Sequence, residues 1–256
     1  MYPEYLPEIV EELLSQGMNT MEYYFEIRSH LTEERKQLHE TIIDNIINIR
    51  NFSRNKRAYI LGGAPANGKS TFLKSAYCNY PGSSLKIDPD EIKKALPEYS
   101  YMIAAGEPLA ASVVHEESSV IAKKLRQAAM KDGIDIILDG VADGTLQNRK
   151  DEYDSFKKNG YFIRMDYVSL DTDLSLILAK KRAEETCREV PQDFVKDMNR
   201  TISRLVPEII EKHYFDELFL WDTNEETAPR LIVQYKNGKL EVVNNALFDN
   251  FKNKAK

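Results

Sequence analysis

Residues 58–71 read AYILGGAPANGKST, an apolar run followed by a glycine-rich turn and then by Lys, Ser and Thr. The turn fits the pattern G-x-x-x-x-G-K-[ST] with Gly63, Gly68, Lys69 and Ser70. At ordinary residue frequencies such a match arises by chance in roughly one chain in a hundred of this length. A predicted strand precedes the turn and a predicted helix follows it, which is the context that this pattern requires. The stretch therefore predicts a phosphate-binding loop.

The residue types in this loop suit a nucleotide. Glycines let backbone N–H groups converge on a β-phosphate, and the start of the following helix adds partial positive charge. Lys69 would reach the β- and γ-phosphates, and the Ser70 hydroxyl would ligate Mg²⁺. A glycine-rich turn that binds no nucleotide is the alternative. We expect the nucleotide-binding residues to be Gly63, Ala64, Pro65, Ala66, Asn67, Gly68, Lys69, Ser70 and Thr71.

Short apolar runs alternate with helical patterns from residue 57 onward. The runs are 58–63, 84–88, 134–140, 161–170 and 217–223, and the helical patterns are 69–77, 89–97, 111–131, 145–158, 171–187 and 191–213. Crossovers of this length imply a parallel sheet covered on both faces. Residues 230–243, RLIVQYKNGKLEVV, add two strand-like runs around an Asn-Gly turn, which predicts a hairpin. The predicted fold is an α/β P-loop domain with about five parallel strands and a C-terminal β-hairpin.

The first fifty residues have a different character. Apolar residues recur at helical spacing between residues 6 and 14 and between residues 38 and 49, which predicts two amphipathic helices. Residues 1–50 hold 10 acidic and 4 basic side chains, so they carry the whole net charge of −6. We expect a helical extension at 1–50 packed on a main domain at 51–256, with a partner-binding arm as the alternative. The chain has no basic excess that would favour binding to long nucleic acid.

Composition excludes further classes of protein. Cys78 and Cys187 lie in no metal-ligand spacing, which argues against a zinc site or a disulfide framework and suits a reducing compartment. The N-terminus lacks the basic region and apolar core of a secretory signal. No run approaches the ~18–20 apolar residues of a membrane span. With 42% hydrophobic and 30% charged residues, we expect a soluble, folded, cytoplasmic protein.

Two carboxylates follow the second predicted strand, in KIDPDEIKKALPEY at 86–99. Asp88 and Asp90 would lie at the carboxyl edge of the sheet, beside the phosphate loop. A carboxylate there can accept the proton of a substrate hydroxyl that attacks the γ-phosphate. Capping of the next helix is the ordinary alternative. Asp90 is favoured as the base, because Asp88 just before Pro89 is better placed as strand end and cap.

A third acidic position ends an apolar strand, in IDIILDGVADG at 134–144. An acid placed like Asp139 commonly holds Mg²⁺ directly or through water. Together with Ser70 it would form the metal site. A strand-terminal Asp in a turn before Gly140 is the alternative.

A basic corner joins the last two predicted helices, in LAKKRAEETCREVPQDFV at 178–195. The stretch from Arg182 to Arg188 spans almost two helical turns, and Pro191 then starts another helix. A lid at about 180–191 would close arginines on the transferring phosphates. A solvated basic helix face is the alternative.

These four segments together resemble the zeta-toxin family of P-loop kinases, whose characterised members phosphorylate UDP-N-acetylglucosamine. The resemblance runs in order from about residue 57 to residue 220, and TEERKQLHETII at 32–43 is similar to the start of many relatives. The segment 87–99 looks like the family's substrate segment, whose aspartate is the base. The resemblance also gives Arg182 and Arg188 the role of the family's lid arginines.

The helix that lines the family's acceptor pocket resembles HEESSVIAKKL at 115–125. This resemblance implies substrate contacts for Asp88 and for Glu116 or Glu117. The chain departs from the family at Asp139, where relatives carry Glu, and at Leu96, where they often carry His. The gap between the two lid arginines is also shorter here.

The function implied by the resemblance is ATP-dependent phosphoryl transfer to a hydroxyl, with ATP and Mg²⁺ as cofactors. The implied acceptor is a nucleotide sugar such as UDP-N-acetylglucosamine, and the implied protein partner is an antitoxin. One alternative is a kinase for another small molecule, such as an antibiotic, a nucleoside or a polynucleotide end. Another is a nucleotide-binding switch or ATPase that acts on a partner through the acidic N-terminal helices.

Overall fold

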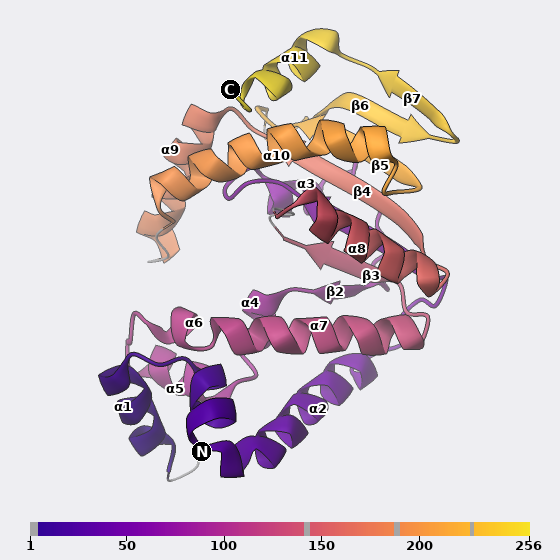
Figure 1. Cartoon of the computed structure of the whole chain (residues 1–256). Coiled ribbons are helices and arrows are strands. Elements are labelled where there is room, and N and C mark those ends of the chain that lie inside the picture. The colour runs from indigo at the N-terminus through magenta and orange to yellow at the C-terminus, as the bar shows by residue number, and fades with distance from the viewer. Residues whose placement is uncertain (1–4, 141–143, 187–189, 226–227) are drawn as a thin grey trace. The chain divides into compact units, whose positions relative to one another are not determined.

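The chain forms two compact units in a computed structural model that describes residues 5–140, 144–186, 190–225 and 228–256 (Figure 1). Unit 1 comprises residues 1–52 and 87–132, and unit 2 comprises residues 53–86 and 133–256. The backbone therefore passes between the units three times. Within the described ranges, no helix has the length and apolarity that crossing a bilayer requires.

Unit 2 contains the sheet, whose strand order is β2-β3-β1-β4-β5-β6-β7. The bounds are β1 (Arg57–Gly62), β2 (Leu85–Ile87, which leads into unit 1), β3 (Ile136–Asp139), β4 (Phe162–Ser169), β5 (Glu217–Asp222), β6 (Arg230–Lys236) and β7 (Lys239–Val242). Strand β1 pairs in parallel with β3 and β4, and β4 pairs in parallel with β5. Strands β6 and β7 add antiparallel pairs at one edge. The predicted fold class and the predicted hairpin are confirmed.

The helices of unit 2 cover both faces of the sheet. They are α3 (Lys69–Lys74), α8 (Leu146–Lys158), α9 (Thr172–Thr186), α10 (Gln192–Lys212) and α11 (Asn245–Asn253). Helices α8 and α10 lie over one face (Figure 1). On the other face, Phe72 of α3 packs into a cluster with Leu61, Val168, Phe219 and Trp221. The alternation of β5 places Leu218 and Leu220, both fully buried, on the face away from that cluster.

Unit 1 is helical. Its α-helices are α1 (Leu6–Gln16), α2 (Thr32–Asn48), α4 (Pro89–Lys93), α5 (Pro97–Ala104), α6 (Ala110–Val113) and α7 (His115–Lys131). A π-helix at Glu22–Ile27 and a 3₁₀ turn at Ser29–Leu31 join α1 to α2. The stripe predicted on α1 is buried, and the helix ends at Gly17 in a left-handed conformation.

The buried face of α2 differs from the predicted apolar face. Ile42 and Ile43 are buried as expected, but Ile49 is 77% exposed. Arg35 and His39 lie on the buried side instead. Arg35 lies two helical turns before Ile42, and His39 lies one turn before Ile43, so the same face of α2 begins with charge and ends with aliphatic side chains.

Candidate functional site

The glycine-rich loop follows β1 directly and opens α3, as predicted. A Cβ atom on Gly63 would lie 2.6 Å from Val168 Cγ2 and 2.8 Å from the Val168 carbonyl oxygen, so only glycine fits against β4 there. Positive φ angles at Ala66 (61°) and Gly68 (81°) alternate with ordinary angles at Asn67 and Lys69. Such alternation turns successive N–H groups toward one side of the backbone, which makes an anion-binding concavity.

Lys69 folds back along this loop. Its Nζ donates to the carbonyl oxygens of Gly63 (2.6 Å) and Ala64 (3.2 Å). The ammonium group is therefore held beside the loop backbone rather than extended into solvent. Ser70 and Thr71 follow in the first turn of α3, and both are exposed. The loop thus gathers a cation and two hydroxyls around its backbone amides.

Asp139 is carried to the start of the loop by the strand order. Leu61 of β1 is in register with Asp139 of β3, and the Gly140 N–H donates to the Leu61 carbonyl (3.3 Å). The carboxylate is 12% exposed and pairs with Lys86 Nζ at 2.9 Å. A position of Asp139 near the loop was expected from the metal site predicted for Ser70 and Asp139. The ion pair with Lys86 was not, because the two residues are far apart in the sequence.

The oxygen donors at this edge fit a magnesium ion that is shared with a nucleotide. Mg²⁺ is usually bound by one or two protein oxygens together with phosphate oxygens and water. Ser70 and Asp139 supply a hydroxyl and a carboxylate of that kind. The described residues contain no group of three or more His, Cys, Asp or Glu that could hold a metal by themselves. A magnesium ion held by Ser70 and Asp139 would take its remaining ligands from phosphate oxygens and water.

The two predicted lid arginines differ in what the structure describes. Arg182 lies near the end of α9 and is exposed. Arg188 lies outside the described residues. The lid role of both stays a prediction.

Asp88 and Asp90 belong to unit 1, where they begin α4. The Asp88 carboxylate accepts a hydrogen bond from the Asp90 N–H (3.0 Å), so Asp88 is the N-cap of α4. Asp90 Oδ1 accepts from Lys93 Nζ at 2.9 Å. The Asp90 side chain is 41% exposed, whereas the Lys93 side chain is only 5% exposed. Asp90 thus presents a carboxylate to solvent, and Asp88 has the capping role that the sequence already favoured for it.

Glu116 and Glu117 begin α7 but point to different surroundings. Glu116 is exposed and accepts a hydrogen bond from Asn19 Nδ2 (3.2 Å). Glu117 is fully buried within unit 1. Its carboxylate accepts from Arg35 Nε (2.6 Å) and contacts His39 Nε2 (2.7 Å).

These buried groups form a larger cluster, the Arg35 cluster, defined as Tyr24, Arg35, His39, Glu98, Glu117 and Lys124. Arg35 also makes a two-pronged contact with Glu98 (2.9 Å for both bonds), and Tyr24 OH donates to Glu98 (2.6 Å). Lys124 Nζ donates to His39 Nδ1 (3.1 Å), which places the ring proton on Nε2, facing Glu117. Burial by itself would raise the pKa of Glu117. Hydrogen bonds from Arg35 and His39 outweigh that effect and lower the pKa to about 2.

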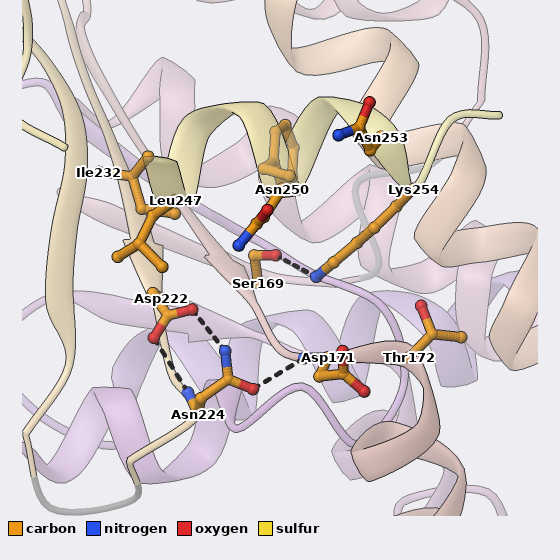
Figure 2. Close-up of a pocket in the computed structure, with 11 residues that line it drawn as sticks. Ser169, Asp171, Thr172, Asp222, Asn224, Ile232, Leu247, Asn250, Asn253 and Lys254 are labelled. Carbon is orange, nitrogen blue, oxygen red and sulfur yellow. Dashed lines mark hydrogen bonds between the residues drawn. The ribbon is translucent and has the colours of Figure 1, made fainter. Parts of the chain in front are cut away.

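A polar cavity of about 440 Å³ lies at the carboxyl ends of β4 and β5, beneath α11 (Figure 2). Lys254 Nζ donates to Ser169 Oγ (2.7 Å) and to the Leu170 carbonyl (2.5 Å). Asn224 bridges the two strand ends, since it donates to Asp222 and accepts from the Asp171 N–H. Burial lowers the pKa of Lys254 to about 8. These polar groups bond one another, so the cavity wall fixes the two chain segments that leave β4 and β5.

The structure brings the predicted site residues together in two groups. The loop, Lys69, Ser70 and Asp139 meet in unit 2, and Asp88, Asp90, Glu116 and Glu117 lie in unit 1. Sequence reasoning missed Thr223, whose Oγ1 donates to the Asn67 carbonyl (2.9 Å) and so supports the loop from the end of β5. The sequence carries no local signal for this contact, because 156 residues separate the partners.

Solved structures from two protein systems are similar to this chain. A crystal structure of the AvrRxo1-ORF1:-ORF2 complex with ATP has a TM-score of 0.69 at 17% identity, covering 86% of this chain and 73% of that one. The complex with sulphate ions has a TM-score of 0.66 at 17% identity, covering 86% and 72%. The PezAT chromosomal toxin–antitoxin system of Streptococcus pneumoniae has a TM-score of 0.63 at 15% identity, covering 87% and 94%. These likenesses concern the fold.

Comparison of the sequence identifies the family in addition to the fold. No curated protein matches the chain. The sequence pattern described as Zeta toxin, however, matches residues 41–229, a range that contains the phosphate loop, both acidic strand ends and the basic corner. Since that range is well over half of the 256 residues, this chain belongs to the Zeta toxin family.

Proposed function

We propose that this protein is an ATP-dependent phosphotransferase that transfers the γ-phosphate to a hydroxyl group. The observation that carries the proposal is the meeting of the glycine-rich loop, Lys69 and Asp139 at the carboxyl ends of the neighbouring strands β1 and β3. Phosphoryl transfer needs mainly positioning and charge neutralisation, and these groups supply both. Family membership supports the same reading.

The loop has a defined role for each polar group. Backbone N–H groups within residues 63–71 would bind phosphate oxygens, except at Pro65, which has no N–H, and at Asn67, whose N–H donates to the Ala64 carbonyl. Lys69 would move its ammonium from the Gly63 and Ala64 carbonyls to the β- and γ-phosphates. Ser70 and Asp139 hold Mg²⁺, which neutralises phosphate charge when bound. Lys86 pairs with Asp139 in the structure, and this ion pair would have to open for Asp139 to hold the metal. Arg182 and Arg188 would stabilise charge on the transferring group.

The acceptor is proposed to be a nucleotide sugar such as UDP-N-acetylglucosamine. Asp90 would take the proton of the attacking hydroxyl, since its carboxylate is partly exposed while that of Asp88 caps α4. Glu116 is exposed and so can contact a substrate. Glu117 is buried and bonded to Arg35 and His39, which favours a structural role for it. The partner is proposed to be an antitoxin protein, because one similar structure comes from a chromosomal toxin–antitoxin system and this chain belongs to the Zeta toxin family.

A phosphate-transfer assay tests this function. Purified protein is incubated with ATP, Mg²⁺ and single acceptors: UDP-N-acetylglucosamine, other sugar nucleotides, nucleosides, a polynucleotide end and an aminoglycoside. Mass spectrometry should detect a gain of one phosphate on a sugar nucleotide, with ADP formed in equal amount. A gain on another acceptor would replace the nucleotide sugar and keep the kinase. ATP hydrolysis at one rate with and without every acceptor would contradict the kinase and favour an ATPase or switch.

A further inference from the structure

Asn67 differs from the other loop residues because its side chain points into the protein. The residue is 3% exposed. Its Nδ2 donates to Asn199 Oδ1 of α10 (3.1 Å), and its Oδ1 accepts from Ser175 Oγ of α9 (2.7 Å). Both partners are as deeply buried, at 4% and 0% exposure. One side chain of the phosphate loop therefore bonds two separate helices, and all of these residues lie in unit 2.

The direction of each bond is fixed by a further contact. Asn199 Nδ2 donates to the Val195 carbonyl of its own helix (3.0 Å), so Asn199 turns its Oδ1 toward Asn67. Asn67 must then offer its NH₂ to Asn199, which leaves Oδ1 for the Ser175 hydroxyl. A residue at position 67 needs a donor and an acceptor on one short planar group. Alanine offers neither, and aspartate would place a second acceptor against Asn199.

The backbone at residue 67 is constrained as well. The Asn67 carbonyl accepts from Thr223 Oγ1 (2.9 Å), and the Asn67 N–H donates to the Ala64 carbonyl (3.2 Å). Left-handed residues stand on both sides, at Ala66 and Gly68. A rotation at residue 67 would thus redirect the neighbouring N–H groups of the loop, because the loop has little freedom elsewhere to compensate.

We propose that Asn67 is a positioning residue that couples phosphate binding at the loop to the packing of α9 and α10. Its amide holds the loop in the curvature that gathers N–H groups on an anion, and the same amide ties the two helices to the loop. Phosphate binding then stabilises α9 and α10, and firm packing of those helices strengthens phosphate binding in return. The inference rests on the proposed nucleotide binding.

Hydrogen exchange with a non-hydrolysable ATP analogue and Mg²⁺ tests the coupling in the full chain. In the wild type, the analogue should slow amide exchange in the loop and in both helices, at 172–186 and 192–212. Asn67→Ala should weaken analogue binding about tenfold, as expected for buried hydrogen-bonding groups left without a partner. It should also abolish the slowing in both helices. Asn67→Asp should retain the slowing in α9 and lose it in α10.

Two milder variants separate coupling from a loss of folding. Ser175→Ala should lose the slowing in α9 alone, and Asn199→Ala should lose it in α10 alone. Asn159→Ala is the matched control, since the amide of Asn159 bonds the Ser155 carbonyl within α8 (2.8 Å) and not the loop. It should bind the analogue and protect both helices like the wild type. If Asn67→Ala does not fold, the coupling is tested by whether Ser175→Ala and Asn199→Ala each lose the slowing of exchange in one helix only.

The outcomes distinguish this inference from the function on which it rests. A wild type that binds no nucleotide overturns both. A wild type that binds the analogue without slowing exchange in α9 and α10 overturns the coupling and leaves the kinase intact. The coupling is also overturned if Ser175→Ala and Asn199→Ala each lose the slowing of exchange equally in both helices. Such a result would indicate a general destabilisation instead of two separate hydrogen bonds from Asn67 to α9 and α10.

Discussion

The contact of Lys69 with two loop carbonyls explains why its removal should affect chemistry more than folding. The ammonium bonds Gly63 and Ala64 within its own loop, and the side chain is not a member of the buried cluster around Phe72. Lys69→Ala should therefore abolish phosphoryl transfer while the thermal unfolding midpoint stays close to that of the wild type. Initial rates from the transfer assay give the comparison, with Lys74→Ala on the exposed side of α3 as control. Activity within a few-fold of wild type would contradict the assignment of the loop.

The two aspartates that begin α4 should respond differently to substitution. Asp90→Asn should keep ATP affinity and lower turnover by ~10²–10⁴, the usual range for losing a positioned base. Asp88→Ala removes the N-cap of α4 and should cost ~0.5–2 kcal/mol of stability. Steady-state kinetics and urea unfolding of both variants separate the effects. The opposite pattern, with turnover lost at Asp88 and stability lost at Asp90, would move the base to Asp88.

At the scale of elements, the sequence predicted the strands and helices whose positions follow from the local spacing of apolar residues. The apolar runs correctly predicted the strands that the structure describes. The helical spacing correctly predicted α1, α2 and the helices of unit 2 up to α10. The helix predicted between residues 38 and 49 corresponds to α2, which begins earlier, at Thr32. The pattern missed the π-helix at Glu22–Ile27, the short α5 and the C-terminal α11, where NALFDNFKN offers few apolar positions. In α11 only Phe251 is buried, so tertiary contact rather than periodicity places that helix.

The Arg35 cluster makes the helices of unit 1 sensitive to acid. Glu117 has a folded pKa of about 2 against an ordinary value of 4.5. Because the folded state binds its proton less readily, stability is fully present above pH ~5 and is lost as the pH falls toward 2, by about 3 kcal/mol. Urea unfolding followed by hydrogen exchange in 115–131 should show this slope. Glu117→Gln should flatten it, and Glu116→Gln, which changes an exposed carboxylate, should not.

Lys254 predicts an opposite effect in alkaline solution. Its folded pKa of about 8 lies below the ordinary value of 10.5, with burial as the main cause. Between pH ~8 and ~10.5 the unfolded chain binds the proton more readily, so stability should rise with pH in that window. Below pH 8 the cost of burying the ammonium is present in full. Lys254→Met should remove the rise, whereas Lys252→Met on the same segment, exposed in the structure, should retain it.

At the scale of the whole molecule, the chain does not divide into simple consecutive segments. Unit 1 combines residues 1–52 with 87–132. The predicted boundary near residue 50 stays a prediction, and a deletion tests it. A chain of residues 53–256 leaves Glu98 and Glu117 without Arg35, and breaking a buried ion pair typically costs ~3–5 kcal/mol. Hydrogen exchange should show 97–131 largely unprotected, while the sheet strands of unit 2 stay protected. If residues 97–131 stay fully protected from exchange in this shortened chain, residues 1–50 are a separable extension, as predicted.

How much of the site could be predicted depends on the range of each contact. The position of the loop between a strand and a helix was predicted, because its motif lies within ten residues. The carboxyl-edge argument was applied to Asp88 and Asp90, but the strand order places β3 with Asp139, and not β2, next to β1. The side-chain bonds of Asn67 were not predicted, since its partners are 108 and 132 residues away. The Arg35 cluster was missed for a related reason: TEERKQLHE reads locally as a solvated helix face.

The Arg35 cluster also sets an order of events during synthesis. Arg35 leaves the ribosome with its helix, but its partners Glu98 and Glu117 follow 63 and 82 residues later. At ~5–20 residues per second, the second partner arrives roughly 4–16 s after Arg35. During that interval the helix α2 carries a guanidinium whose final place is buried, so it stays in water rather than docking early. We therefore expect unit 1 to complete its packing only after α7 has been synthesised.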